Sequence, residues 1–467
     1  EMCIRDRLSV DNKPYTALAL FEPAHQQPGA VKDQPLASYT TDRAARHLLR
    51  TSREMGLKWQ DHNRDGVIDI AYEFFTPDEP HRVSHVPKGA YELNEQQKKR
   101  ALISMQAWAD VTRIKFSHKG ASTEGRLTLG LYKGNEESYA TLPFPKSFKK
   151  GGEAWLDSGH AQPRTDRYDQ HVMAHEIGHT LGLDHTGDYT QQPATRDYLE
   201  DTQAYSVMSY NPEIRSGQNF SKDAQWTHYS VAPLMHDIAA IQAAYGANYQ
   251  TRRGDTVYGF NSTTERDYFS LKSARDAPVF CIWDGGGDDT LDCSGFNQKQ
   301  TINLNAEAFS DVGGMKGNVS IAKGVTVENA IGGSHDDTLI GNNANNRLKG
   351  GGGADTLRGG GGADVFVYDK ASDSTAAGAD LITDFVSGRD RIDLTGLSQS
   401  TRTQLRLVHT YSGRAGDTLV RFNAYSNRYF VAIDLTGNGQ TDFLLKSTRL
   451  IRPQDISGLM TSRPIFG

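Results

Sequence analysis

The chain has 467 residues, too many for one ordinary domain, so two or three domains are expected. A formal net charge of −6 excludes the basic balance typical of proteins that bind nucleic acid or anionic membranes. The absence of any run of 18 apolar residues excludes a transmembrane helix, and three cysteines are too few for a disulfide scaffold.

The first residues predict no folded element. EMCIRDRLSV lacks the apolar core of a secretory signal peptide, so residues 1–17 are interpreted as an N-terminal extension. The domain that follows is expected to cover residues 18–250, and a second domain is expected over 251–467.

A calcium-loop-like segment comes next. DHNRDGVID places oxygen-bearing side chains at the spacing of an EF-type loop. The twelfth position is Tyr72 rather than Glu, so the loop is not a complete EF-hand. A calcium site and a plain turn before the strand IDIAYEF both stay open. The candidate ligands are Asp61, Asn63, Asp65 and Asp69.

Helical and strand-like patterns alternate up to residue 250. Apolar residues recur at helical spacing over 94–112, whereas 124–132 alternates as a strand does. The segment 232–246 predicts a helix that begins near Pro233 and ends at Gly246. A mixed α/β domain is therefore expected.

The segment HEIGHTLGLDH predicts a metal site. His175 and His179 are four residues apart, so they share one face of a helix that is expected to end at Gly182. The turn at this glycine lets His185 return as a third ligand. Three neutral imidazoles suit Zn²⁺, with a fourth position open to water.

Glu176 follows the first histidine and predicts catalysis. A zinc ion lowers the pKa of bound water, and Glu176 is placed to act as general base and then to protonate the leaving amine. A structural zinc site usually has four protein ligands and has no use for this glutamate. The motif HExxHxxGxxH is the metzincin pattern, and YSVMSY supplies its Met-turn with Met208. The sequence therefore predicts a zinc peptidase acting on protein or peptide substrates.

The chain changes character near residue 250, where glycine, aspartate and short apolar runs replace the helical patterns. Cys281 and Cys293 flank a turn there, and either a disulfide or two small buried side chains is open. Other histidines are interpreted as structural: His160, His171, His228 and His236.

Nonapeptide repeats fill residues 332–367. They follow the template GGxGxDxUx, the calcium-binding repeat of RTX proteins, which stacks into a parallel β-roll with U pointing inward. Asn346 occupies the Asp position of the second repeat, so its site is expected to be weaker. The expected ligands are Gly333, Asp337, Gly350, Gly351, Gly353, Asp355, Gly359, Gly360, Gly362 and Asp364.

With these motifs the chain resembles the serralysin family of secreted bacterial zinc metalloendopeptidases. The resemblance rests on HEIGHTLGL, GDYT, EDTQAYSVMSY, DIAAIQAAYGAN, GDTVYGFNS and GNVSIAKGVTVENAIGGS. It implies a metzincin catalytic domain, an all-β calcium-binding parallel β-roll and a C-terminal β region. It also implies that Tyr210 reaches the zinc and stabilises the oxyanion.

The resemblance implies two further calcium sites in the region before the repeats. The first is formed by Arg252, Gly254, Thr256, Asp284, Gly286 and Asp289. The second is formed by Gly287, Asp289, Thr326 and Glu328.

Two residues depart from the family pattern. Thr186 stands where the family usually has proline, which is expected to loosen the turn, and Asp184 is interpreted as a solvated turn residue. The segment DLTGNGQTD (434–442) is interpreted as a turn.

Coupled calcium binding and folding predicts a secreted, extracellular monomer that folds after export. The resemblance implies a type I exporter that reads a C-terminal signal and a proteinaceous inhibitor as partners, although PQDISGLMTSRPIFG runs past the point where family members end. The alternative function is a calcium-dependent RTX binding or adhesion protein whose protease-like domain is inactive. Retention of Glu176 with all three histidines favours the enzyme.

Overall fold

The structure is a computed structural model that describes residues 2–4, 36–78, 83, 85–120, 124–134, 138–143, 152–162, 167–189, 195–222 and 226–461. Most of the predicted N-terminal extension therefore lies outside the described residues. The chain forms two compact units, the first comprising 1–251 and 279–283 and the second 252–278 and 284–467.

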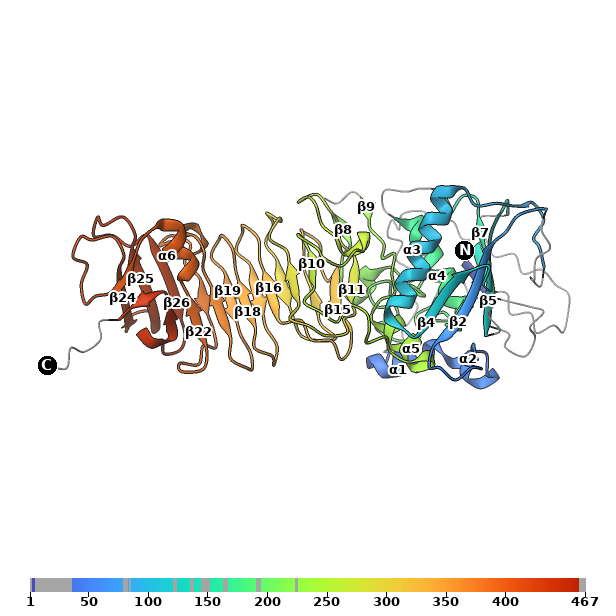
Figure 1. The fold of residues 1–467 in the computed structure, drawn as a ribbon, viewed down its shortest axis with the longest axis horizontal. Helices are drawn as coiled ribbons and strands as arrows, with labels where there is room; N and C mark the ends of the chain where they lie inside the picture. Colours follow the sequence, from blue (N-terminus) through green and yellow to red (C-terminus); the bar gives the residue numbers. More distant parts are fainter. Residues whose placement is uncertain are drawn as a thin grey trace. The chain divides into compact units, whose positions relative to one another are not determined.

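The first unit is a mixed α/β domain in which helices lie beside a sheet (Figure 1). Its helices are α1 (Thr41–Leu48), α2 (Arg50–Met55), α3 (Glu95–Val111), α4 (Tyr168–Thr180), η1 (Glu213–Ser216) and α5 (Met235–Tyr245). Its strands are β1 (Met2–Ile4), β2 (Ile68–Phe74), β3 (Ala90–Tyr91), β4 (Ile114–His118), β5 (Gly125–Tyr132), β6 (Ser138–Ala140), β7 (Gly152–Asp157), β8 (Ser221–Lys222), β9 (Trp226–Thr227) and β11 (Phe280–Ile282).

The main sheet has the order β1-β6-β7-β5-β2-β4, and β3 pairs with β5. Strands β2, β4, β5 and β7 run parallel to one another, whereas β6 runs antiparallel to β7 and β3 antiparallel to β5. Every residue of β7 is buried, as expected for a strand covered on both faces. Helix α4 packs against β6 and β7, which brings the HExxH segment to this side of the sheet.

The predicted helices and strand of the first unit are confirmed. Helix α3 begins after Asn94, whose side chain accepts from the Gln97 N–H at 2.9 Å while the Gln97 side chain accepts from the Asn94 N–H at 2.9 Å. Helix α5 ends at Gly246, whose φ of 84° is in the left-handed region that glycine adopts easily. Strand β5 covers all but the first residue of the predicted segment.

The second unit is a parallel β-roll that continues into a C-terminal β region. Its elements are β10 (Val257–Gly259), η2 (Asp267–Phe269), β12 (Thr290–Asp292), β13 (Thr301–Asn303), β14 (Phe309–Ser310), β15 (Val319–Ile321), β16 (Asn329–Ile331), β17 (Thr338–Ile340), β18 (Arg347–Lys349), β19 (Thr356–Arg358), β20 (Val365–Val367), η3 (Ala371–Asp373), β21 (Leu381–Ile382), β22 (Arg391–Asp393), α6 (Thr395–Thr401), β23 (Leu405–Leu407), β24 (Asp417–Asn423), β25 (Arg428–Asp434), β26 (Phe443–Ser447), η4 (Pro453–Asp455), β27 (Ile456–Ser457) and β28 (Leu459–Met460).

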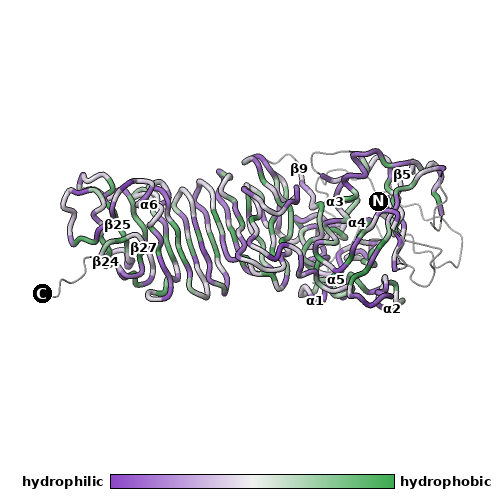
Figure 2. Tube along the Cα trace, viewed as in Figure 1, coloured by the Kyte–Doolittle hydropathy of each residue, from purple (hydrophilic) through white to green (hydrophobic). Residues whose placement is uncertain are grey.

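Two sheets form the faces of the roll. One has the order β10-β12-β16-β18-β20-β22-β27, and the other begins β13-β17-β19-β21 before it continues into the C-terminal strands. Successive strands of each face are parallel and in register, with Leu339 opposite Leu357 and Leu348 opposite Phe366. Bands of hydrophobic and hydrophilic residues alternate along the stacked turns (Figure 2).

The core of the roll consists of one apolar side chain from the middle of each short strand. Leu339, Leu348, Leu357 and Phe366, the residues predicted to point inward, are all fully buried. One turn alone buries too little apolar surface to be stable, so the stacking itself supplies the core. The predicted fold class, a mixed α/β domain followed by a parallel β-roll, is confirmed.

Cys293 is a buried free thiol, so Cys281 and Cys293 are not bridged. This favours the interpretation of the pair as small buried side chains. Within the described residues, no helix is both long enough and apolar enough to cross a bilayer.

Candidate metal sites

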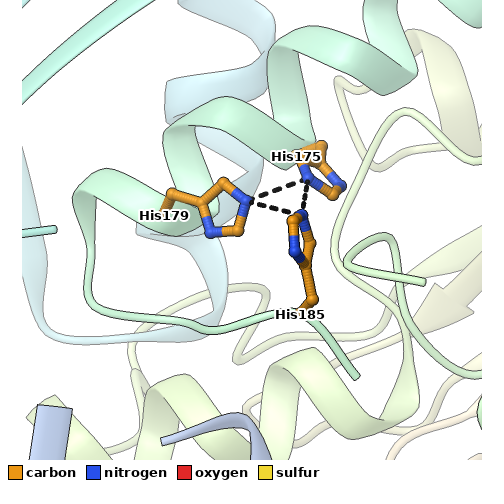
Figure 3. Close-up of side chains that lie close together, drawn as sticks. All are labelled: His175, His179 and His185. Carbon is orange, nitrogen blue, oxygen red and sulfur yellow. Dashed lines mark hydrogen bonds between the residues drawn. The ribbon is translucent and has the colours of Figure 1, made fainter. Parts of the chain in front are cut away.

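Helix α4 and the turn after it bring three imidazoles together. His175 and His179 lie on one face of α4, and Gly182, with φ of 100°, turns the chain so that His185 returns toward them. The Nε2 atoms lie 3.0 Å apart for His175 and His179 and 3.2 Å from His185 in both other pairs (Figure 3). The predicted triad is therefore assembled.

The opposite ring nitrogens orient two of the three imidazoles. His175 Nδ1 lies 2.7 Å from the Val207 carbonyl oxygen, and His179 Nδ1 lies 2.6 Å from the Leu183 carbonyl oxygen. A carbonyl can only accept, so each Nδ1 carries the proton and each Nε2 presents its lone pair. This is the tautomer that a metal ligand needs.

Burial keeps the triad neutral. It lowers the pKa of His179 to about 4, and it holds the pKa values of His175 and His185 well below the ordinary value, helped by repulsion among the three rings. Three neutral imidazoles converge in this buried site, and among the described residues each Nε2 has only the other two rings as hydrogen-bond partners. A bound cation resolves this, and three nitrogen donors fit Zn²⁺.

Glu176 occupies the adjacent position on α4. Its side chain is fully buried, and neither carboxylate oxygen accepts a hydrogen bond from the described residues. Burial raises the pKa of this carboxyl well above its usual range. A buried acid without a partner is costly, which is typical of a group whose partner arrives with the metal and substrate.

The Met-turn lies beneath the histidines. Met208 is fully buried, and a Cβ at Gly178 would come within 2.7 Å of its sulfur, so the glycine of the HEIGH segment makes room for it. Tyr210 follows, with its ring centroid 4.6 Å from that of His185 and 5.6 Å from that of His175. The structure thus brings Tyr210 to the triad, as the resemblance implied.

Asp237 anchors the Met-turn and was not found from the sequence. Its buried carboxylate accepts from Ser206 Oγ at 2.5 Å, the Val207 N–H at 2.8 Å and the Leu234 N–H at 2.9 Å. Burial raises the pKa of Asp237 to about 7. The Val207 carbonyl oxygen also accepts from His175 Nδ1, so the Asp237 carboxylate holds the residue that orients the first zinc ligand. Its position at the start of α5 was a signal for capping, not for a role at the metal site.

One expectation for the turn after the triad is wrong. Asp184 is buried rather than solvated, and its carboxylate accepts from the Thr51 N–H at 2.8 Å. At Thr186 the hydroxyl donates to the buried carboxylate of Asp201 at 2.5 Å, and looseness of the turn relative to proline stays a prediction. Both residues tie the turn to neighbouring segments.

The predicted calcium residues lie on turns that stack along the roll. They occupy the turn before β10 (Arg252, Gly254, Thr256), the turn before β12 (Asp284, Gly286, Gly287, Asp289), the segment before β16 (Thr326, Glu328), the turn before β17 (Gly333, Asp337), the turn before β19 (Gly350, Gly351, Gly353, Asp355) and the turn before β20 (Gly359, Gly360, Gly362, Asp364).

The turn before β12 and the segment before β16 bring together carboxylates that repel one another. Asp289 accepts from the Thr256 N–H at 2.8 Å and its own N–H donates to Glu328 at 2.8 Å. Burial raises the pKa of Asp289 to about 7, with a further rise from the charge of Asp284, and burial also raises the pKa values of Asp284 and Glu328. A divalent cation would relieve this repulsion.

In the repeats, each aspartate is bonded to the next turn. The Asp337 N–H donates to Asp355 Oδ1 at 2.7 Å, and the Asn346 N–H donates to Asp364 Oδ1 at 2.9 Å. Burial raises the pKa of Asp355 to about 7 and that of Asp364 to about 6, and the Oδ2 atom of each accepts no hydrogen bond from the described residues. These oxygens fit calcium ligands.

Glycine makes room for these carboxylates. A Cβ at Gly350 would overlap Asp355 Oδ2, and one at Gly359 would overlap Asp364 Oδ2. A Cβ at Gly353 would come within 2.6 Å of the His335 carbonyl carbon, so the turn before β19 lies directly on the turn before β17. The glycines of the template therefore serve close approach of turn to turn.

In the two loops outside the roll, aspartate side chains accept hydrogen bonds from backbone N–H groups of the same loop. In the first, Asp61 accepts from the Arg64 and Gly66 N–H groups and Asp65 accepts from the Val67 N–H. Asp69 lies in β2 and donates its N–H to Glu124 at 2.8 Å. The calcium site and the plain turn both stay predictions. In the second loop, Asp434 accepts from three successive N–H groups of the turn (Gly437, Asn438 and Gly439).

Two family models match the chain. Residues 247–456 match the serralysin C-terminal domain of peptidase family M10, and residues 151–237 match the reprolysin-like metallopeptidases of family M12B. The metalloprotease AprA of Pseudomonas entomophila is 45% identical over 442 residues, which cover 90% of each chain. The serralysin of Photorhabdus luminescens is 41% identical over 433 residues, which cover 86% of each chain. The serralysin of Proteus mirabilis is 44% identical over 400 residues, which cover 76% of this chain and 80% of that one.

Proposed function

This chain belongs to the serralysin family of metalloproteases, with His175, His179 and His185 as its zinc-binding triad, and on that premise we propose that it is a secreted endopeptidase of broad specificity stabilised by calcium. The observation that carries the proposal is Glu176, a buried carboxylate placed beside three convergent imidazoles and bonded to none of the described residues. The catalytic unit is proposed to cover 18–250 and the roll 251–467, which is supported by the change of compact unit at Arg252.

In the proposed mechanism Glu176 moves the proton. A zinc ion held by the triad would polarise water and the scissile carbonyl. Glu176 accepts the proton of the attacking water, and its raised pKa then favours delivery of that proton to the leaving amine. The ring of Tyr210 lies 4.6 Å from that of His185, and its hydroxyl is proposed to stabilise the developing oxyanion.

Substrate recognition is proposed to occur along β6. This strand lies at the side of the sheet next to α4 and runs antiparallel to β7. Its outer side pairs with an extended segment, the parallel strand β1, whose place a substrate strand would take. A substrate that adds as a strand is held by main-chain hydrogen bonds, which depend little on side chains. Broad sequence tolerance follows.

The calcium ligands are proposed to be the carboxylates and turn carbonyls named above. The raised pKa values of Asp289, Asp355 and Asp364 support this, because burial opposes their charge unless a cation is present. The proposal of secretion depends on the same calcium ions, because calcium outside the cell would drive folding of the roll. The exporter and the inhibitor stay predictions from the resemblance.

The decisive test compares Glu176→Gln with the wild type in casein hydrolysis, each with and without a zinc chelator. The variant keeps the size of the side chain but cannot act as a base, so kcat is expected to fall by about 10²–10⁴-fold with zinc content unchanged. The inactive adhesion alternative predicts no chelator-sensitive hydrolysis in either protein. Equal rates for the variant and the wild type would contradict the mechanism.

A further inference from the structure

One buried carboxylate joins the two segments that supply the third histidine and Tyr210. Asp201 is fully buried, and its Oδ1 accepts from Thr186 Oγ1 at 2.5 Å, from Tyr189 OH at 2.6 Å and from Ser209 Oγ at 2.7 Å. Thr186 directly follows His185, and Ser209 directly precedes Tyr210. The three hydroxyls therefore come from both sides of the metal site.

Asp201 depends on these hydroxyls. Among the described residues, no lysine or arginine lies within ion-pair distance of it, so hydrogen bonds must offset the cost of burying its charge. Within the described ranges, its Oδ2 accepts only the more distant Asp197 N–H, at 3.3 Å. A Cβ at Gly187 would come within 2.5 Å of Oδ2, so the backbone also closes tightly over the carboxylate.

Tyr189 links Asp201 to Tyr210, because its hydroxyl is held by Asp201 and its ring contacts the ring of Tyr210. Its ring stacks on the ring of Tyr210, with centroids 4.5 Å apart and an angle of 16° between the planes, and lies 5.3 Å from the ring of His185. A stacked ring held at its hydroxyl cannot rotate away without breaking a charge-assisted hydrogen bond. Tyr189 therefore forms a fixed wall on one face of Tyr210.

We propose that Asp201 is a positioning residue for Tyr210: by holding Tyr189 it keeps the Tyr210 ring against the zinc histidines, and through Thr186 it ties that position to the His185 turn. The proposal rests on the role of Tyr210 in the proposed function. The Thr186 hydroxyl is a feature of this chain, because a proline at that position could donate no hydrogen bond.

Copper(II) substituted for zinc gives a readout that does not depend on activity. A tyrosinate oxygen close to Cu²⁺ produces a ligand-to-metal charge-transfer band, and the difference between wild type and Tyr210→Phe isolates the contribution of Tyr210. Tyr189→Phe removes the tether and keeps the stacked ring, whereas Asp201→Asn weakens all three hydrogen bonds. We expect both variants to lose at least half of the Tyr210-dependent band.

Kinetics of the zinc proteins supply the second readout. If Tyr210 acts on the transition state, kcat is expected to fall about tenfold in Tyr189→Phe and Asp201→Asn, with KM within about twofold. The matched control is Thr202→Val, because Thr202 is buried next to Asp201 but its hydroxyl pairs with Ser216 at 2.6 Å. The control is expected to keep the full band and the wild-type kcat.

The outcomes separate this proposal from the proposed function. If Tyr210→Phe removes the band while Tyr189→Phe and Asp201→Asn retain it at full intensity, the positioning role is overturned and the peptidase mechanism stands. If the wild-type band does not depend on Tyr210, both the positioning role and the oxyanion role of Tyr210 are overturned. Should Asp201→Asn fail to fold by circular dichroism, Tyr189→Phe alone decides.

Discussion

The carboxyl of Asp237 is buried away from water, yet it holds the loop that supports the zinc histidines. Its three hydrogen-bond donors, Ser206 Oγ and the N–H groups of Val207 and Leu234, do not fully offset the loss of hydration, and burial raises its pKa from 3.8 to about 7. The stability of the catalytic unit should therefore depend on pH through this one residue.

Asp237→Asn is expected to flatten that dependence. A raised pKa means that the contribution of Asp237 to stability is fully present below about pH 4 and is lost as the pH rises through about 7. The loss is at most about 4 kcal/mol, at 1.36 kcal/mol per pKa unit. Asparagine can accept both N–H groups and never ionises, so chemical unfolding measured from pH 4 to pH 8 should show a smaller decline than in the wild type.

The control for this prediction is Asp237→Ala, which leaves the Val207 and Leu234 N–H groups without an acceptor. Compared with Asp237→Asn, it should be less stable at every pH by about 1–3 kcal/mol. A parallel decline with pH in Asp237→Asn and the wild type would show that another group titrates.

Single residues differ in how far the sequence reveals them. His175, His179 and His185 were predictable because metal ligands follow the helical repeat and the glycine turn. Asp201 and Asp237 were not, because their donors lie in segments whose proximity only the folded chain establishes. The same limit explains the wrong interpretation of Asp184 as solvated, since its partner Thr51 is 133 residues away.

Among the elements, the turn before β19 shows why the repeat template requires glycine at particular positions. Gly350 lies against the carboxylate of Asp355, whereas the nearest atom to a Cβ at Gly352 would be 3.7 Å away, an ordinary contact. The two glycines of this turn therefore provide a test substitution and a matched control.

Gly350→Ala is expected to displace the Asp355 carboxylate, because the new methyl group would overlap Oδ2. We expect a loss of about 1–3 kcal/mol in the stability of the calcium-loaded roll, the range typical of overpacking, and weaker calcium binding by titration calorimetry. Gly352→Ala should leave both nearly unchanged. Equal effects of the two substitutions would contradict a carboxylate site at Asp355.

In the turn before β18, Asn346 stands where the template has aspartate, and its side-chain amide is fully hydrogen-bonded within the protein. Asn346 Oδ1 accepts from the Asn342 N–H at 2.8 Å, and its Nδ2 donates to the Glu328 carbonyl at 2.9 Å and to Asn342 Oδ1 at 3.0 Å. This turn is closed by its own hydrogen bonds, which supports the expectation of a weaker calcium site.

Asn346→Asp should make this turn dependent on calcium. The carboxylate would face two acceptor oxygens in place of the two bonds that Nδ2 donates, so the calcium-free roll is expected to lose about 1–3 kcal/mol of stability. With calcium, the variant should bind an additional ion by elemental analysis. Asn343→Asp, at an exposed position of the same turn, is the control and should change neither result.

The elements themselves were predictable where their repeat was long. Helix α3 follows an apolar repeat over 17 residues, and the strands of the roll follow the nonapeptide template. Short strands without such a template, including the two-residue β8 and β9, were not predictable because two residues carry no periodicity.

For the whole molecule, the proposed calcium ligands predict that folding of the roll depends on both calcium ions and protons. Burial raises the pKa values of Asp289 and Asp355 to about 7 and that of Asp364 to about 6. Without calcium, the stability contributed by these groups is present below about pH 4 and is lost as the pH rises through 6 to 7. Calcium at the proposed sites would bind the charged forms and should reverse this trend.

Chelation of calcium is therefore expected to be more damaging at pH 8 than at pH 5. Melting temperatures measured with a calcium chelator should fall as the pH rises, whereas those measured in excess calcium should not. Circular dichroism of the chelated protein, measured as the pH rises, should show a loss of β structure. We expect this loss to come from the region past residue 250. A calcium-free protein that is as stable at pH 8 as at pH 5 would contradict the proposed ligands.

The bonding of each repeat aspartate to the next turn has a consequence for how the roll is built. The Asp337 N–H closes on Asp355, and the Asp355 N–H closes in turn on Asp380 at 2.8 Å, so no carboxylate becomes ordered independently of its neighbour. Such a chain behaves as a one-dimensional array, in which starting a new ordered stretch is harder than lengthening an existing one. Calcium binding should consequently advance from one turn to the adjacent turn. Molecules with only some of their calcium sites filled should be rare compared with calcium-free and fully loaded ones.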